Sequence, residues 1–294
     1  MAPTARTAAN ASAVPQDAAE ENFFLRFWGV RGTIACPGGE YVRYGGNTSC
    51  IEIRCGKRLL ILDAGTGLRP LGVHLSKNGV IDADLLLTHT HLDHVAGLPF
   101  FLPIFKQGNS IRFWAGHLAG TMGLKDVIKR MLDAPLFPVP MSALGAKIKF
   151  CDFECGDTLE PHEGIVVRTA HLNHPNGATG YRIEFAGKSI CYVTDTEHTG
   201  HGLDQNILKL IKGTDIFIYD STYTEAEYPE FKGWGHSTWE EGAKLAEAAG
   251  VRTFVIFHHA PEHNDNFMDE IADSARRRLR DSVVVAREGL ILRP

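Results

Sequence analysis

Short apolar runs recur along the chain, and most of them end at a glycine-containing turn or at a group of polar residues. Runs rich in β-branched and aromatic residues, without a helical period, predict strands. The expected strands are 22–30, 49–54, 58–62, 84–88, 111–115, 147–153, 164–170, 181–185, 189–193, 215–219, 253–257 and 283–286. Segments with helical spacing of apolar residues predict helices at 68–78, 121–132, 203–212, 238–249 and 266–280.

The order of these elements predicts the architecture. Strands come first mostly as hairpins, and strands then alternate with helices to the end of the chain. In both halves a strand is followed by a polar loop and then a helix. This order favours an α/β fold of two mixed sheets packed face to face, with helices outside and a site along one sheet edge. Residues 1–20 are expected to be a disordered tail, and 21–294 a single domain because no linker divides them.

Composition narrows the class of protein. The 294 residues are 44% hydrophobic and 22% charged, which is ample for a large core. The net charge of -5 shows no basic surplus of the kind that nucleic-acid-binding proteins carry, and no apolar run is long enough to span a membrane. The six cysteines are scattered and no secretory signal is present, so we expect reduced thiols and a cytoplasmic location. Cys151 and Cys155 could bind a structural metal, although ordinary thiols are favoured.

The densest group of polar residues follows the apolar run Leu85–Leu87. His89 and His91 lie two residues apart, so both side chains can point at one position from a turn. Asp93 and His94 follow on the next bend and can point at a second position nearby. Imidazole and carboxylate are ligands for zinc or a similar metal, and such ligands converge from loop ends in hydrolytic sites. The alternative is a polar surface turn, which four ligand-type side chains in this spacing disfavour.

Ligand-type side chains also follow other expected strands, namely His174, Asp195 and His258. Together with the four residues above, they could fill two adjacent metal positions that share one carboxylate. The alternatives are a surface loop for His174 and a turn for Asp195. Asp63 also ends a strand before a glycine turn, where it could brace the site or simply cap the turn.

The segment Thr88–His94 resembles the signature loop of the metallo-β-lactamase superfamily, and residues 23–294 resemble the branch that contains ribonuclease Z and related zinc phosphodiesterases. The resemblance implies the αββα sandwich of that superfamily and a pair of divalent metal ions. It implies one metal held by His89, His91 and His174, another held by Asp93, His94 and His258, and Asp195 as the bridge between them.

The same resemblance decides between neighbouring histidines. His174 is favoured over His171 by its spacing to the Gly-Tyr-Arg-Ile stretch that follows, and His258 is favoured over His259. Asp63 is similar to the supporting aspartate of the first family motif.

Two residues are expected to have catalytic roles, one of them through the resemblance. The stretch Gly235–Thr238 resembles the loop that supplies a histidine to the scissile phosphate in the ribonuclease Z branch, which makes His236 a catalytic residue. Asp93 is expected to orient or deprotonate the attacking water. The alternative for the His236 loop is plain helix capping, because Ser237 or Thr238 is a natural cap.

The expected activity is hydrolysis of a phosphodiester by metal-activated water. Two departures from ribonuclease Z limit the substrate: no long Gly/Pro-rich arm is present, and Asp220 stands where the family has a glutamate. We therefore expect a small phosphodiester, such as a cyclic nucleotide, rather than transfer RNA. The aromatic stretch 100–105 and Phe137 could stack a base.

Several alternatives stay open at this point. Zinc is the expected metal, with manganese or iron as alternatives. Hydrolysis of a thioester, lactone or β-lactam on the same metals is the main rival activity, followed by an iron redox protein and by a binding module without chemistry. No stable nucleic-acid partner and no membrane contact are expected, and the resemblance allows a homodimer.

Overall fold

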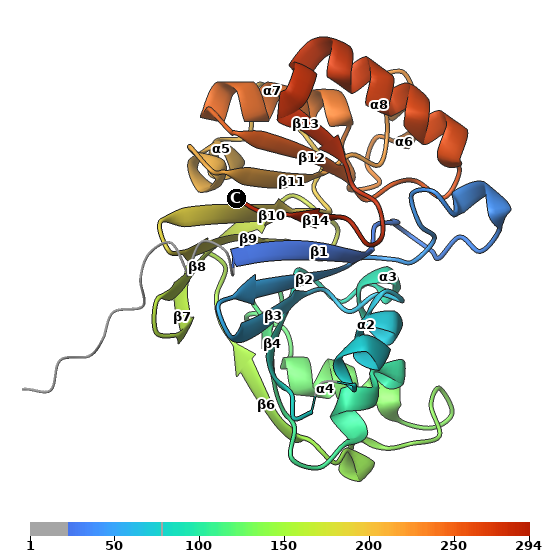
Figure 1. The fold of residues 1–294 in the computed structure, drawn as a ribbon, viewed down its shortest axis with the longest axis vertical. Helices are drawn as coiled ribbons and strands as arrows, with labels where there is room; N and C mark the ends of the chain where they lie inside the picture. Colours follow the sequence, from blue (N-terminus) through green and yellow to red (C-terminus); the bar gives the residue numbers. More distant parts are fainter. Residues whose placement is uncertain (1–22, 78) are drawn as a thin grey trace, which may run out of the picture.

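The computed structural model of the protein describes residues 23–77 and 79–294. The expected disordered tail, residues 1–20, lies outside these described residues. Two seven-stranded sheets lie against each other, and helices cover their outer faces (Figure 1). The predicted α/β sandwich of two mixed sheets is confirmed.

The first sheet contains the N-terminal strands and the last strand, in the order β14-β1-β2-β3-β4-β5-β6. Its strands are β1 (Phe23–Gly29), β2 (Cys50–Cys55), β3 (Arg58–Leu62), β4 (Asp82–Leu87), β5 (Ser110–Ala115), β6 (Lys147–Asp152) and β14 (Ile291–Leu292). β1 to β3 pair antiparallel, whereas β3 to β6 pair parallel. The carboxyl ends of β3 and β4 therefore lie at the same sheet edge.

The second sheet has the order β13-β12-β11-β10-β9-β8-β7. Its strands are β7 (Thr158–His162), β8 (Ile165–Leu172), β9 (Ala178–Phe185), β10 (Lys188–Val193), β11 (Ile216–Asp220), β12 (Thr253–Phe257) and β13 (Val283–Val285). β10 to β13 pair parallel. Both β8 and β10 pair antiparallel with β9, so β8 runs in the same direction as β10. The carboxyl ends of β8, β10, β11 and β12 thus share one edge.

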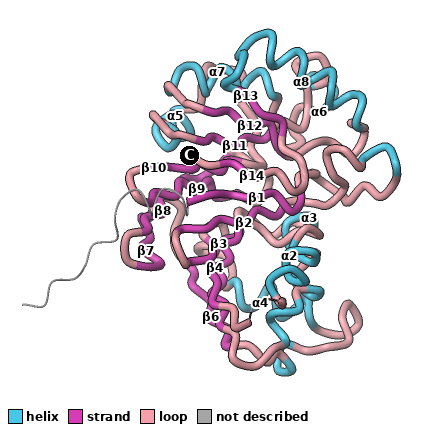
Figure 2. The backbone as a smooth tube through the Cα atoms, viewed as in Figure 1, coloured by secondary structure: helices cyan, strands magenta, loops and turns pink. Residues whose placement is uncertain are grey.

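Helices form the two outer layers (Figure 2). They are α2 (Leu68–Leu75), α3 (Leu92–Val95), α4 (Leu124–Leu132), α5 (Gln205–Ile211), α6 (Tyr228–Phe231), α7 (Trp239–Ala249) and α8 (Asp265–Leu279), with short 3-10 turns η1 (Gly39–Tyr41), η2 (Leu98–Phe100), η3 (Leu102–Phe105), η4 (Met141–Ala143) and η5 (Arg280–Ser282). One apolar cluster joins α2 and α4 to the first sheet, and another joins α5, α7 and α8 to the second.

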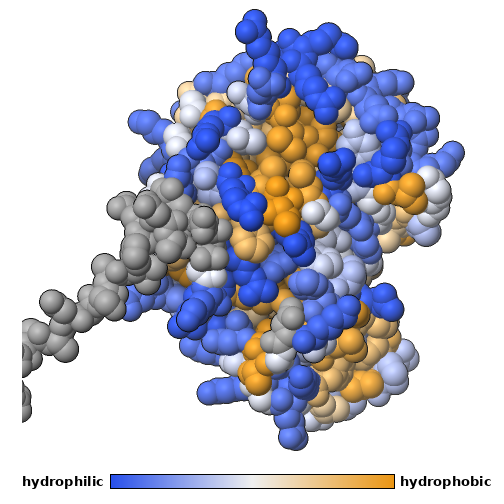
Figure 3. Space-filling model, in the orientation of Figure 1, coloured by the Kyte–Doolittle hydropathy of each residue, from blue (hydrophilic) through white to orange (hydrophobic). Residues whose placement is uncertain are grey.

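A third apolar cluster lies between the sheets and joins residues such as Phe27 and Leu62 to Tyr192 and Phe257. On the face shown in Figure 3, apolar side chains reach the surface among polar ones. Leu290, which packs against this central cluster, is only partly buried. The central cluster fixes how the two sheets face each other, and so how their loop-bearing edges meet.

Most expected elements are confirmed to within a few residues, but the pattern does not predict β7 or β14. β7 contains Glu160 and Pro161, which break the apolar alternation, and β14 has only two residues. The helix expected from residue 121 begins at Leu124, because Gly123 has an extended backbone. No helix among the described residues is long and apolar enough to cross a bilayer.

Gly242 marks a close contact between α7 and the second sheet. A Cβ at this position would lie 2.6 Å from ring atoms of both Phe254 and Tyr219. Alanine is a better helix former by ~1 kcal/mol, but overpacking a rigid core costs ~1–3 kcal/mol. We expect Gly242→Ala to lower the free energy of unfolding by about 1 kcal/mol in urea denaturation. The control is Gly39→Ala, where the new Cβ meets no atom within 4 Å; equal effects of both variants would contradict this packing.

Candidate metal centre

Seven ligand-type side chains meet where the strands of both sheets end, and they form two groups: His89, His91 and His174, and Asp93, His94, Asp195 and His258. His89 and His91 follow β4, and Asp93 and His94 lie in α3. His174, Asp195 and His258 follow β8, β10 and β12. The structure thus brings together all seven residues that the sequence singled out as ligands.

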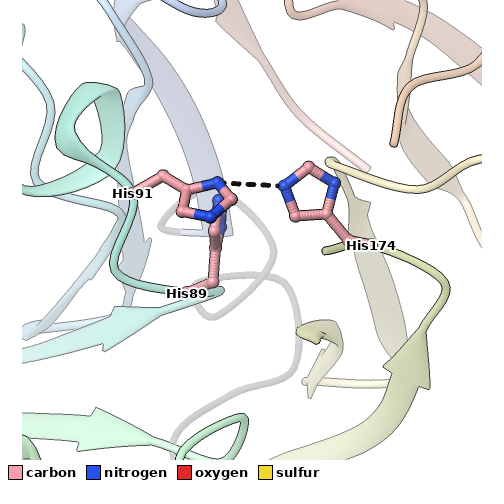
Figure 4. A group of neighbouring side chains, drawn as sticks. All are labelled: His89, His91 and His174. Atoms are coloured by element: carbon pink, nitrogen blue, oxygen red, sulfur yellow. Dashed lines mark hydrogen bonds between the residues drawn. The ribbon is translucent and has the colours of Figure 1, made fainter. Parts of the chain in front are cut away.

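The first group is made of three histidines (Figure 4). Nδ1 of His91 lies 3.1 Å from Nε2 of His174. The ring centre of His89 lies 4.4 Å from that of His91 and 4.8 Å from that of His174. Three imidazoles from two sheets therefore face one small volume.

The second group pairs two buried imidazoles with carboxylates. Nε2 of His94 lies 3.3 Å from Nε2 of His258. Oδ2 of Asp93 lies 3.3 Å from the first of these nitrogens and 3.5 Å from the second. Both histidines are fully buried.

Asp195 lies between the two groups and turns one carboxylate oxygen to each. Its Oδ2 lies 3.1 Å from Nε2 of His94 and 3.3 Å from Nε2 of His258. Its Oδ1 lies 3.7 Å from Nε2 of both His89 and His174. A carboxylate in this position could bridge two metal ions.

Metal ions fit these two positions. Zinc binds imidazole nitrogen at ~2.0–2.1 Å, so neighbouring ligand atoms of a tetrahedral site lie ~3.3 Å apart, close to the distances seen here. Nε2 of His89 is buried and has no hydrogen-bond partner, a costly state that a metal bond would relieve. Burial also lowers the pKa of His89, which keeps its ring neutral, as a metal ligand must be.

The electrostatic environment of the second group favours positive charge. Burial opposes protonation of His94, but Asp195, Asp93 and Asp63 outweigh it and raise the pKa of that ring well above its usual value. In turn, the imidazoles offset the burial of Asp93 and Asp195 and lower the pKa of both carboxyl groups. The carboxylates that favour a proton on His94 would also attract a metal ion at this position.

Hydrogen bonds to the second ring nitrogens orient the ligands. Nδ1 of His174 donates to the carbonyl oxygen of Gly235 over 2.7 Å, and Nδ1 of His258 lies 3.0 Å from the hydroxyl oxygen of Thr222. With the proton on Nδ1, Nε2 is left with a lone pair that faces the cluster.

Asp63 orients the ring of a third candidate ligand, His94. Its carboxylate is fully buried and accepts from Nδ1 of His94 over 2.8 Å. It also accepts from the backbone N–H of Thr88 over 2.8 Å and from the hydroxyl of Tyr192 over 2.8 Å. The residue therefore ties the ligand loop of the first sheet to β10 of the second.

Removal of this carboxylate would leave several buried donors without a partner. We expect Asp63→Ala to lower the free energy of unfolding by about 3 kcal/mol and to weaken zinc binding by ~10–100-fold. Tyr192→Phe is the matched control, because it removes one donor, costs about 1 kcal/mol and leaves His94 in place. Chelator competition measures the affinity; an unchanged zinc affinity in Asp63→Ala would show that Asp63 does not orient His94.

His236 lies at the rim of the cluster. Its Nδ1 donates to Oδ2 of Asp220 over 2.9 Å and lies 3.9 Å from Oδ1 of Asp195. Burial works against a charged ring here, but Asp220 outweighs it and raises the pKa of His236 to about 9. Helix α7 is capped by Thr238, whose side chain accepts from the N–H of Glu241. The cap of α7 therefore uses Thr238 and leaves the His236 side chain to face the cluster.

Three residues of the site adopt left-handed backbone conformations at strand ends. The φ angles are 58° for Asp63, 57° for Asp195 and 65° for His258. Such conformations are unfavourable for residues other than glycine, and they concentrate at functional sites. Here the sharp turn after each strand aims the side chain into the cluster.

The structure distinguishes between the alternative ligand residues. His171 is exposed, and His259 is buried with Nε2 donating to the carbonyl oxygen of Ala286, so neither joins the cluster. Among the described residues no cysteine belongs to a ligand group; Cys155 instead contacts the hydroxyl of Thr179. The sequence did not single out Tyr192 or Thr222 as supports, because neither residue type marks such a role.

Fold and site together define a metallo-hydrolase. A family model described as "Beta-lactamase superfamily domain" matches residues 58–259. The chain belongs to the metallo-β-lactamase superfamily, in its ribonuclease Z-like branch.

Individual proteins are similar over most of their length. The chain is 24% identical to ribonuclease Z of Haloarcula marismortui, over 83% of this chain and 90% of the other. Zinc-bound PqqB of Methylobacterium extorquens has a TM-score of 0.68 at 19% identity, covering 92% of this chain and 99% of that one. A diphosphatase of the PhnP family has a TM-score of 0.66 at 17% identity, covering 92% and 97%.

Proposed function

We propose that this protein hydrolyses a phosphodiester with water activated by two divalent metal ions. The observation that carries the proposal is the placement of Asp195, whose two oxygens face two separate groups of ligand atoms. A carboxylate shared in this way suits a pair of metal ions a few ångströms apart, as two-metal hydrolases use. His89, His91 and His174 would hold one ion, and Asp93, His94 and His258 the other.

When bound, such ions supply a water of lowered pKa and offset the charge on the phosphoryl oxygens. The remaining contributions come from the chain itself. Burial opposes a charged His236 ring, but Asp220 raises its pKa to about 9, and the ring can donate to a phosphoryl oxygen or protonate the leaving oxygen. Asp220 keeps that ring charged and fixes its orientation.

Asp93 supports the nucleophile. Burial alone would raise the pKa of this carboxyl group, but the His94 and His258 rings lower it well below its usual value, so it stays a carboxylate. The backbone N–H of Thr33 donates to its Oδ2 over 2.8 Å and holds it in place. A fixed carboxylate beside the metal positions can orient the attacking water or accept its proton.

Relatives support the reaction class. Their names include ribonuclease Z and a diphosphatase, both of which point to phosphate esters or anhydrides. We propose zinc as the metal and a small phosphodiester, such as a cyclic nucleotide, as the substrate, acted on by a single cytoplasmic domain that could pair as a homodimer. The net charge of -5 supports a small substrate over a long polyanion.

RNA is the second candidate, and a basic groove favours it. The groove has a volume of about 630 Å³ and runs beside β8, the strand that leads to the first histidine group. Arg168, Arg182, Lys209 and Lys212 line it, against the single carboxylate of Glu184. Phosphate contacts by such residues make binding fall steeply with salt.

The direct test is a substrate comparison. Purified protein of known metal content would be given bis(4-nitrophenyl) phosphate, a thioester, a lactone and a short RNA. We expect turnover of the phosphodiester. Cleavage of the acyl substrates alone would overturn the proposal, and cleavage of RNA with a steep salt dependence would select the second candidate.

A further inference from the structure

Trp234 places a large aromatic ring at the surface, two residues before His236. The residue is 63% exposed and stands between Gly233 and Gly235, both with positive φ. It belongs to the loop between α6 and α7 that also carries His236. Most of the indole lies outside the core, so it presents an aromatic surface that a ligand could contact.

The loop around Trp234 is rigidly held. The carboxylate of Glu197 accepts from the N–H of Gly233 over 2.7 Å and from the N–H of Gly235 over 2.9 Å. The hydroxyl of Tyr228 donates to the same carboxylate over 3.0 Å. The backbone N–H of Trp234 donates to the carbonyl oxygen of Phe231 over 3.1 Å. The backbone is thus fixed on both sides of the exposed ring.

This loop also contacts the candidate metal ligands. The carbonyl oxygen of Gly235 accepts from Nδ1 of His174, and a Cβ on Gly235 would lie 2.5 Å from that same nitrogen. Trp234 is therefore one residue from a direct support of the first histidine group and two residues from His236.

A series of ring contacts runs from Trp234 back to His236. The Trp234 ring meets Phe231 edge-on with centres 5.5 Å apart. Phe231 stacks on Tyr223 with centres 4.4 Å apart and planes within 5° of parallel. Tyr223 then lies 6.2 Å from His236. These contacts back the indole from one side and leave its remaining surface to solvent.

Two other exposed apolar side chains adjoin residues of the site in the sequence. Ile34 is 62% exposed and follows Thr33, the residue that donates to Asp93. Leu92 is 76% exposed, immediately before Asp93. Phe100 and Phe137, which the sequence offered for base stacking, pack edge-on against each other with centres 6.0 Å apart, and Phe100 is 53% exposed.

We propose that Trp234 stacks on a nucleobase attached to the scissile phosphate. The inference rests on the proposed phosphodiesterase function and names its substrate class as a nucleotide. A fixed aromatic ring binds any base face, and such stacking strengthens binding by ~1–3 kcal/mol per base, which corresponds to ~5–150-fold in affinity. Glu197 holds the loop so that little freedom is lost when the base arrives.

The test compares two ligands that differ only in the base. Calorimetry on the zinc-loaded protein would measure the Kd of AMP and of ribose 5-phosphate. We expect AMP to bind at least tenfold more tightly to the wild type. Trp234→Ala should bring the two Kd values together without changing that of ribose 5-phosphate, and Trp234→Phe should keep most of the difference. Val80→Ala is the control. Val80 is exposed and precedes β4, whereas the candidate ligands follow that strand, so this variant should behave as the wild type.

Each outcome decides the proposal separately from the reaction class. Equal Kd values for the two ligands in the wild type, or a Trp234→Ala variant that weakens both equally, would overturn base stacking even if phosphodiesters are cleaved. A change of oligomeric state in Trp234→Ala with unchanged Kd values would assign the ring to a subunit contact and also overturn it. Base-dependent binding without phosphodiester turnover would keep the stacking site and reject the proposed reaction. A trinucleotide distinguishes the two possible sources of the base. If it binds much more tightly than AMP and this binding depends on Trp234, the base belongs to an RNA end. Equal Kd values for the trinucleotide and AMP indicate a free nucleotide.

Discussion

Replacing Asp195 with alanine is expected to lower kcat/KM for a phosphodiester by ~10⁴-fold, because metal-centred charge stabilisation contributes several kcal/mol to such reactions. Asp195 supplies an oxygen to each ligand group, and its neighbours are four imidazoles within 3.7 Å. Without the carboxylate, two cations would repel each other across the gap with no shared anion. Metal content should therefore fall below two ions per chain.

The measurement is turnover of bis(4-nitrophenyl) phosphate together with elemental analysis of the same protein. Asp152→Asn is the control, since Asp152 also ends a strand but belongs to no ligand group. It should keep both activity and metal. An Asp195→Ala protein that retains two metal ions per chain would show that this carboxylate is not the bridge.

Replacing His236 with alanine is expected to lower kcat by ~10²–10⁴-fold, the usual range for a positioned general acid, while both metal ions stay bound. The ring lies at the rim, and its Nδ1 is taken by Asp220 over 2.9 Å. That bond leaves Nε2 to face a substrate. Asp220→Asn should cause a smaller loss of kcat of the same kind, because the ring remains but its positive charge is no longer supported.

Measurement of the metal content also tests the alternative that His236 is a metal ligand. His236 lies close enough to His174 and Asp195 to form a ligand group with them. If metal content falls in step with kcat in His236→Ala, this histidine is a ligand and not the acid. Thr238→Ala separates helix capping from the role of His236. It removes the cap of α7, so it should lower the free energy of unfolding by about 1 kcal/mol with little effect on kcat.

The convergence of the candidate ligands could be predicted from the sequence for a physical reason. Parallel strands place their carboxyl ends at one edge, so polar residues such as His89, Asp195 and His258 that directly follow apolar runs converge in space. The same apolar runs define most strands. Short or interrupted strands cannot be predicted from apolar runs, because β14 has only two residues and β7 contains Pro161.

The supports of the site are harder to predict. Tyr192 and Thr222 hold Asp63 and His258 through single hydroxyl groups, and their sequence surroundings are ordinary apolar strand ends. Glu197 follows β10 and accepts hydrogen bonds from the loop after α6, 36 to 38 residues away. Such contacts follow from the tertiary fold and not from local pattern.

The most direct measurement of the central claim is a zinc titration of metal-free protein, with turnover of bis(4-nitrophenyl) phosphate followed at each addition. The two ligand groups joined by Asp195 predict that activity rises to a plateau at two zinc ions per chain and that it is lost again on chelation. Full activity without metal, a plateau at one ion, or no phosphodiester cleavage at full loading would contradict a shared two-metal centre.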